Sequence, residues 1–154
     1  MNKVKTNPES NVIDVIVADL FKTFRLEYKK LIKVDFSAIR PGLSLLHFLV
    51  LRTLSEAGSL PISEIGKRLL VPGPQMTHLA DQLIKMELVV RIPDSNDRRI
   101  IRMQMTGEGE IVLTKCRALL RKNVKKKLSY LKNEELKDLS ILLRGLGEIL
   151  AGME

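Results

Sequence analysis

Residues 61–109 decide the fold, and they read PISEIGKRLLVPGPQMTHLADQLIKMELVVRIPDSNDRRIIRMQMTGEG. The apolar spacing predicts a first helix from Ile62 to Leu70. Pro61 suits its start, because a proline lacks the backbone N–H that would be unpaired there. The turn Val71-Pro72-Gly73-Pro74 follows, and a second helix is expected to run to about Met86. This segment therefore predicts a helix-turn-helix.

A two-stranded hairpin is predicted directly after the second helix, over residues 89–105. Residues that favour extended backbone flank the turn Pro93-Asp94-Ser95-Asn96, and Arg98 and Arg99 lie near its tip. A helix can enter the major groove of DNA, and a basic ribbon tip suits the backbone or the minor groove. The helix-turn-helix and the hairpin together indicate DNA binding.

The remainder of the chain is predicted to be helical. Apolar residues at three-to-four spacing and capping residues predict helices over about 10–33 and 44–57, a helix that begins after Thr106, and a last helix opened by Asn133. The fold class is mainly α with a small β-hairpin wing (α+β). We expect a single domain over residues 1–154, divided as follows: a winged helix-turn-helix lobe over 44–105 and a helical dimerisation region over 10–40 and 107–154.

The helices at both ends of the chain carry many Leu, Ile and Val residues. That apolar surface exceeds what one lobe needs to cover, which indicates an intertwined homodimer. Two-fold symmetry would then present two recognition helices to two half-sites of DNA. The alternative is that these helices pack on their own lobe.

The net charge of +8 and a pI of about 9.7 fit a polyanionic partner. Residues 61–105 carry only 7 Lys and Arg against 5 Asp and Glu, so the case for DNA rests on where the arginines lie. A denser basic run follows, and we interpret it as a solvated helix face, with flanking DNA or an anionic ligand as the alternative. Its members are Arg117, Arg121, Lys122, Lys125, Lys126 and Lys127.

The sequence lacks the motifs that are typical of several other classes of protein. It has no glycine-rich phosphate loop, no nucleophile motif and no cluster with metal-ligand spacing, so we expect neither an enzyme nor a cofactor or metal. No segment resembles a signal peptide or a membrane span, and the single Cys116 fits a reducing compartment, so a cytoplasmic protein without a membrane partner is expected. A buried structural thiol is favoured over a redox switch for Cys116.

Three segments together resemble the MarR family of bacterial and archaeal transcription regulators. They are Ile62–Leu69 (ISEIGKRL), Asp81–Val89 (DQLIKMELV) and the wing Pro93–Arg99 (PDSNDRR), and the helix start at Thr106–Gly109 follows at the family spacing. The resemblance covers nearly the whole chain and is strongest over residues 44–113. It implies a homodimeric regulator that binds double-stranded DNA at a pseudo-palindromic operator, acts as a repressor and is released by a small effector.

A winged-helix scaffold for protein interactions that has lost specific DNA binding is the alternative. Retention of Asp97, Arg98 and Arg99 in the wing argues against it. The resemblance implies that Asp97 and Arg99 form a DNA element in which the carboxylate orients the guanidinium. A narrow minor groove attracts such a side chain. A salt bridge that only pins the hairpin is the alternative for this pair.

The residues expected to contact DNA share predicted positions on the exposed face of the two helices or at the wing tip. Gln75 suits a bidentate contact with adenine, whereas Lys67 and Arg68 suit phosphates, with ordinary solvated side chains as the alternative. The full set is Lys67, Arg68, Pro74, Gln75, Thr77, His78, Arg98 and Arg99, with Asp97 orienting the wing.

The sequence departs from the family at two places. The family usually caps the recognition helix with Ser or Thr, whereas Pro72, Gly73 and Pro74 stand here. Glu87 replaces a common glycine before Leu88, which predicts backbone strain if that position has a positive φ.

Family members often bind small aromatic acids between the dimer helices and the DNA-binding lobe. That property implies a pocket for a small aromatic or anionic effector lined by Tyr28, Phe36, His47 and Phe48. The alternative, which we favour for each residue, is that it belongs to the core.

Overall fold

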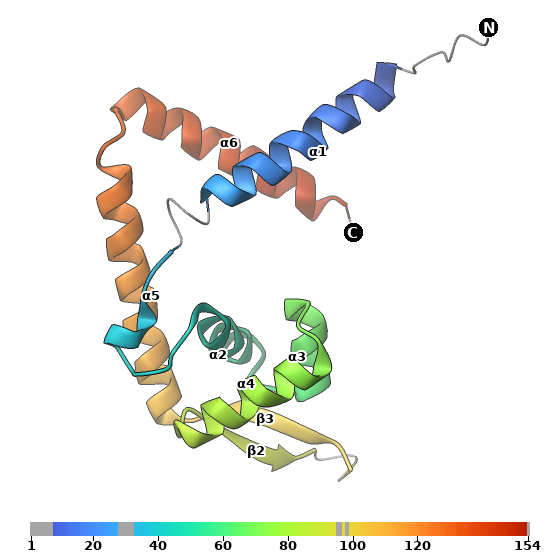
Figure 1. Cartoon of the computed structure of the whole chain (residues 1–154), viewed down its shortest axis with the longest axis vertical. Coiled ribbons are helices and arrows are strands. Elements are labelled where there is room, and N and C mark those ends of the chain that lie inside the picture. Colours follow the sequence, from blue (N-terminus) through green and yellow to red (C-terminus); the bar gives the residue numbers. More distant parts are fainter. Residues whose placement is uncertain (1–7, 28–32, 95–96, 98, 154) are drawn as a thin grey trace, which may run out of the picture. The chain divides into compact units, whose positions relative to one another are not determined.

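The computed structural model describes residues 8–27, 33–94, 97 and 99–153. The chain forms two compact units, which Figure 1 shows in sequence colours. The central unit contains residues 34–120, and the terminal unit contains residues 1–33 and 121–154. The predicted fold class is confirmed, because the described chain is mostly helical with a small antiparallel sheet.

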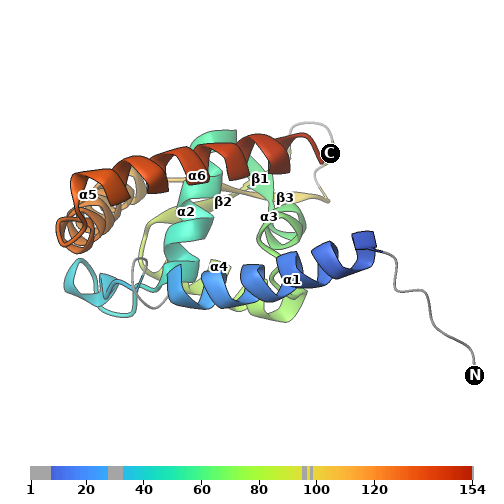
Figure 2. The same ribbon diagram turned by 90° about the horizontal axis from the view of Figure 1, so that it is seen from above.

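The central unit contains the helix-turn-helix and the wing. Its elements are a 3-10 helix (Phe36–Ala38), α2 (Leu45–Ala57), β1 (Ser59–Pro61), α3 (Ile62–Leu69), α4 (Gly73–Lys85), β2 (Val89–Pro93), β3 (Ile101–Met105) and the first part of α5 (Gly107–Leu128). Figure 1 shows the β2–β3 hairpin below α4, and Figure 2 shows α2 and α3 from above.

The sheet has three strands in the order β1-β3-β2, with both pairs antiparallel. Arg102 on the middle strand is paired with Pro61 on one side and with Ile92 on the other. The sequence had predicted the hairpin alone. Strand β1 was missed because it is only three residues long, follows Gly58 and ends with the proline that precedes α3, a pattern typical of a turn.

Local signals explain where the helices begin. The Ser44 side chain caps α2, and Thr106 Oγ1 accepts a hydrogen bond from the Gly109 amide at 3.0 Å in the first turn of α5. Gly109 also permits close packing, because a Cβ at this position would collide with the Leu88 carbonyl oxygen. Helix α4 begins after Pro72 without a side-chain cap, and Pro74 lies in its first turn. This confirms the predicted departure from a hydroxyl cap.

The turn after α4 contains the strained residue that the sequence suggested. Glu87 has a φ of 60°, in the left-handed region that favours glycine. The Glu87 carbonyl accepts a hydrogen bond from Thr106 Oγ1 at 2.7 Å, and the Leu88 amide bonds to Leu83 at 3.0 Å. These contacts hold the backbone conformation despite the side chain.

One hydrophobic core fills the central unit. Leu51, Ile65, Leu83, Leu88 and Met103 are fully buried in it, so α2, α3, α4 and the sheet share a single interior. The core also includes residues outside the 44–105 lobe that the sequence analysis delimited. Phe36, Leu43, Val112, Leu113 and Cys116 belong to it, which explains why the central unit extends from 34 to 120.

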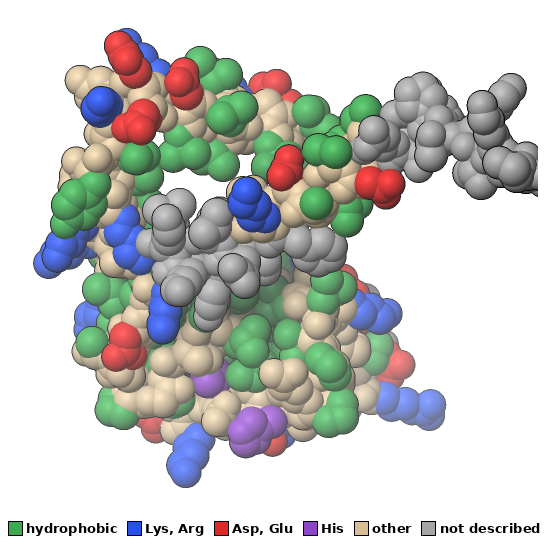
Figure 3. Space-filling view, turned by 45° about the horizontal axis from the view of Figure 1, so that its top comes forward, with side chains coloured by type: hydrophobic (Ala, Val, Ile, Leu, Met, Phe, Trp, Pro, Cys, Tyr) green, Lys and Arg blue, Asp and Glu red, His purple; other side chains and the backbone are tan. Residues whose placement is uncertain are grey.

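The terminal unit contains α1 (Pro8–Glu27), the last part of α5 and α6 (Asn133–Ala151). Both α1 and α6 expose large apolar side chains, visible as green atoms on each in Figure 3. On α1 these are Val12, Ile13, Val15, Ile16, Val17 and Leu20, and on α6 they are Ile141, Leu142, Leu143, Leu146, Ile149 and Leu150. None of the described helices is long and apolar enough to cross a membrane.

Candidate nucleic-acid interface

Helix α4 presents one buried face and one polar face. Met76, Leu79 and Leu83 point into the core, as the spacing predicted. Gln75, Thr77 and His78 are exposed near the start of the helix. Thr77 Oγ1 donates to the Gly73 carbonyl at 3.1 Å, so its hydroxyl is partly engaged by its own helix. The amide of Gln75 and the ring of His78 are the longer polar groups on this face.

The turn between α3 and α4 forms an apolar hollow of about 720 Å³, lined among others by Ile62, Leu70, Val71 and Met76. Leu70 is 91% exposed and has a φ of 53°, which is unusual for a leucine. The Leu70 amide donates to the Lys67 carbonyl at 3.2 Å, which ends α3 and fixes this conformation.

The two basic residues of α3 differ in their surroundings. Both Lys67 and Arg68 are exposed, as expected for phosphate contacts. Arg68 Nε, however, lies 3.0 Å from Glu64 Oε1 one turn earlier. The charge of Arg68 is therefore partly balanced within the helix, which leaves Lys67 as the stronger candidate of the two.

An ion pair joins α4 to the β2–β3 hairpin. Asp81 Oδ1 on α4 lies 2.6 Å from a guanidinium nitrogen of Arg91 on β2, and both side chains are about half exposed. Arg91 is not predictable as a partner of Asp81 from the sequence, because the two residues belong to different elements and no local motif links them. The pair restrains the Arg91 guanidinium beside α4 and partly balances its charge.

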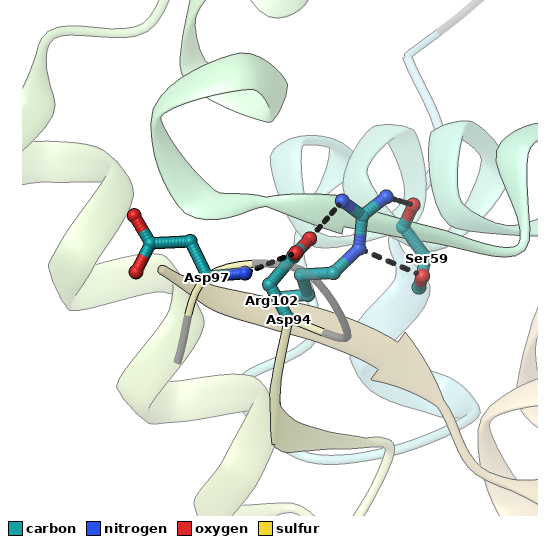
Figure 4. A network of polar contacts seen from close by, with 4 residues as sticks. All are labelled: Ser59, Asp94, Asp97 and Arg102. Carbon is teal, nitrogen blue, oxygen red and sulfur yellow. Dashed lines mark hydrogen bonds and ion pairs between the residues drawn. The ribbon is translucent and has the colours of Figure 1, made fainter. Parts of the chain in front are cut away.

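A second polar network runs from the sheet to the wing tip (Figure 4). Arg102 donates to Ser59 and to Asp94, and Asp94 Oδ1 accepts from the Asp97 amide at 3.1 Å. Asp97 Oδ1 in turn accepts from the backbone amide of Arg99 at 2.9 Å. Arg98 lies outside the described residues.

The role expected for Asp97 needs correcting. We expected its carboxylate to hold the guanidinium of Arg99, but the contact in the structure is with the backbone N–H of Arg99. An aspartate two residues before an amide closes a local turn in this way. Asp97 therefore fixes the course of the chain at the wing tip, and the exposed Arg99 side chain extends from that fixed backbone.

The described residues of the expected effector pocket belong to the core. Phe36 and Phe48 are buried and stack on each other with 5.4 Å between ring centroids. His47, which precedes Phe48 in the sequence, is also buried. Its Nε2 lies 3.0 Å from Gln82 Oε1 on α4. These positions agree with the alternative given above. Tyr28 lies outside the described residues.

Burial perturbs two titratable groups of the central unit. Desolvation lowers the pKa of His47 below its ordinary value of 6.5, against the opposing effect of the Gln82 hydrogen bond. The neutral ring also suits its contacts, because Nδ1 accepts from the Ser44 amide at 3.1 Å. Burial raises the pKa of the Cys116 thiol to about 11, so the thiol stays protonated and is a structural residue, as favoured from the sequence.

The basic run along α5 is mostly solvated. Arg117, in the central unit, is exposed and donates weakly to Ser55 Oγ at 3.5 Å. Arg121, Lys122, Lys125 and Lys126 are exposed in the terminal unit. Whether this run contacts DNA stays a prediction.

Comparison with known proteins identifies the class to which this fold and surface belong. Residues 43–101, from the start of α2 to the wing, match the MarR family. The chain is 33% identical over 101 residues to the transcriptional regulator YpoP of Bacillus subtilis, with 66% of this chain and 67% of YpoP covered. The chain belongs to the MarR family of winged helix-turn-helix transcriptional regulators, a family of DNA-binding proteins rather than enzymes.

Two further relatives from Bacillus subtilis are the transcriptional regulator YhbI and the transcriptional repressor MdtR. Each is 33% identical to this chain, over 98 and 97 residues respectively. The matches cover 63% of this chain, 64% of YhbI and 63% of MdtR, so the chain spans less than two thirds of the length of either relative.

Solved structures share the fold over almost the whole chain. YusO from Bacillus subtilis has a TM-score of 0.65 at 26% identity, covering 92% of this chain and 99% of YusO. The regulator BldR from Sulfolobus solfataricus has a TM-score of 0.63 at 28% identity, covering 98% and 100%. A mutant of Escherichia coli MarR complexed with operator DNA has the same fold, with a TM-score of 0.64 at 21% identity over 92% and 99%.

Proposed function

We propose that this chain is a homodimeric, sequence-specific DNA-binding repressor that recognises a pseudo-palindromic operator. The observation that carries the proposal is the exposed polar face of α4 beside a basic hairpin. Gln75 and His78 lie on that face, and the wing ends in Arg99 on a backbone held by Asp97. A polar helix face and a neighbouring arginine tip are suited to the two grooves of one half-site.

The candidate DNA-binding side chains fall into three groups, suited to base edges, to phosphates and to the minor groove. Gln75 has the paired donor and acceptor that can read an adenine edge, and His78 and Thr77 lie near it. Lys67 and Arg68 on α3 suit the phosphate backbone, and Pro74 is exposed in the first turn of α4. Arg99 suits the minor groove, with Arg98 beside it in the sequence.

Dimerisation is supported by the apolar surface of the terminal helices. Leu146 is 42% exposed and Ile149 67% exposed on α6, and Ile13 is 60% exposed on α1. A monomer would leave these side chains in water, whereas a second copy of the chain would cover them. A two-fold dimer would supply the two recognition helices that a pseudo-palindromic operator requires.

The relatives support repression and operator binding. MdtR, at 33% identity, is a transcriptional repressor, and the mutant Escherichia coli MarR was crystallised with operator DNA. Release by a small effector stays a prediction, and residues other than Phe36, His47 and Phe48, which belong to the core, would have to line its site. A cytoplasmic location, where the DNA of a bacterium or archaeon lies, follows from the same proposal.

A salt-titrated mobility shift on genomic fragments tests this function. We expect a small set of fragments to stay bound at a salt concentration that releases the others, because specific contacts add to the charge-dependent affinity. Equal retention of all fragments, or binding of none, would instead favour a winged-helix scaffold for protein interactions. Sedimentation of the same preparation measures whether the bound species is a dimer.

A further inference from the structure

All three guanidinium nitrogens of Arg102 are engaged within the protein, unlike those of Arg91 and Arg99, the other described arginines of the wing. Nε donates to Ser59 Oγ at 3.0 Å, and one terminal nitrogen donates to the Ser59 carbonyl at 2.6 Å. The other terminal nitrogen donates to Asp94 Oδ2 at 2.8 Å. Three of the five N–H donors of Arg102 are therefore used within the protein, and its charge is paired with that of Asp94.

Asp94 connects Arg102 to the turn of the wing. We call the contacts of Arg102 with Ser59 and Asp94 the clamp. The Asp94 side chain is 12% exposed and that of Arg102 28%, so their contact is partly shielded from water and salt. The second oxygen of Asp94 accepts from the Asp97 amide, and the Asp94 amide donates to the Ile100 carbonyl at 2.9 Å. Asp94 thus fixes the two sides of the turn that carries Arg99.

The contacts form a continuous series from β1 to the wing tip. Arg102 bonds to Ser59 on β1 and to Asp94, and Asp94 bonds to the Asp97 amide (Figure 4). Asp97 in turn accepts from the Arg99 amide. The series also has an electrostatic effect, because Arg102 balances a carboxylate that would otherwise repel nearby phosphates. Because β1 leads directly into α3, the wing tip is anchored to the helix-turn-helix.

We propose that Arg102 is a positioning residue for DNA binding: it sets the wing tip through Asp94 and does not itself contact DNA. The proposal rests on the DNA-binding function proposed above. It extends that function by naming a residue that acts only through the turn that carries Arg99.

Hydrogen exchange tests the clamp without DNA. In the Arg102→Met variant we expect the amides of Asp97, Arg99 and Ile100 to exchange at least about tenfold faster than in the wild type, with core amides little changed. Arg52→Met is the matched control, because it removes an arginine from an exposed pair with Glu56 on α2, outside the network. Unchanged wing exchange in Arg102→Met, or equal acceleration in Arg52→Met, would overturn the clamp.

A double-mutant cycle then tests its role in binding. Arg102→Met should lower operator affinity at least about fivefold in the wild-type background and by less than about twofold in the Arg99→Ala background, because the loss passes through the wing tip. Arg102→Lys should restore part of the affinity by keeping the charge beside Asp94. Equal losses in both backgrounds, or a loss of one phosphate contact from the salt slope in both, would overturn the positioning role.

Hydrogen exchange and the double-mutant cycle together distinguish a failure of the proposed function from a failure of this inference. If the wild type shows no specific DNA binding, the proposed function fails while hydrogen exchange still decides whether the clamp exists. If the wild type binds an operator and the cycle is additive, the function stands and this inference fails.

Discussion

Asp81 on the recognition helix and Arg91 on the first strand of the wing form an ion pair with 2.6 Å between the carboxylate oxygen and the guanidinium nitrogen. Both side chains are about half exposed, so the pair contributes no more than about 1 kcal/mol to stability. Its importance lies in its place, because it restrains a cation between the two elements proposed to bind DNA.

Removal of the Asp81 charge should loosen the specificity of binding. In Asp81→Asn, Arg91 gains freedom to meet phosphates and each protomer gains a net positive charge. We therefore expect tighter binding to non-operator DNA, a steeper salt dependence and little change in melting temperature. Anisotropy titrations with a non-operator duplex at two salt concentrations measure this. Weaker binding to that duplex would contradict the expectation.

The wing arginine should matter for binding and not for folding. Arg99 is exposed, and its structural contact is made by its backbone amide, which alanine retains. Arg99→Ala should therefore weaken operator binding by about 1–3 kcal/mol per half-site with little change in melting temperature. An affinity within about a factor of two of the wild type would show that the wing is no DNA element here.

A carboxylate in the apolar surface of α6 should disrupt assembly. Leu146→Glu places a charge where we propose that a second copy packs, so sedimentation should show a monomer or an unfolded chain. Ser140→Glu adds the same charge at an exposed polar position of the same helix and should remain dimeric. A wild-type protein that sediments as a monomer at micromolar concentration would rule out the proposed dimer.

Acid should destabilise the central unit through His47. Burial lowers the native pKa below 6.5, so the unfolded chain binds more protons as the pH falls through that value. This contribution to stability is present above pH 6.5 and is lost toward the lower native pKa. His47→Gln keeps a polar group at the helix start and does not titrate. Its free energy of unfolding should therefore fall less than that of the wild type between about pH 7 and pH 5. Parallel pH profiles would contradict this.

Local sequence signals predicted the helices and the hairpin well. Ser44, Pro74 and Thr106 mark helix starts that the structure confirms, and Glu87 has the positive φ that its replacement of glycine suggested. These signals depend on neighbours within a few residues, so they can be read from the chain directly.

Long-range side-chain contacts were not predictable in the same way. Arg102 and Ser59 are 43 residues apart and Asp81 and Arg91 belong to different elements, so neither pairing leaves a local pattern. For the aromatic residues Phe36 and Phe48 the sequence favoured the core over a pocket, and the stacking of the two rings agrees with that. The partner of Asp97 was a backbone amide, which residue identity alone does not reveal.

The central claim is that the exposed face of α4 reads DNA sequence, and binding to a panel of single-base operator variants at two salt concentrations tests it most directly. We expect Gln75→Ala to lose discrimination at one base pair in each half-site, because the amide reads a donor–acceptor pattern. Lys67→Ala, the control, should lower affinity for every variant and flatten the salt dependence. If the wild type binds all variants equally, or Gln75→Ala weakens all of them by the same factor, α4 does not read sequence as proposed.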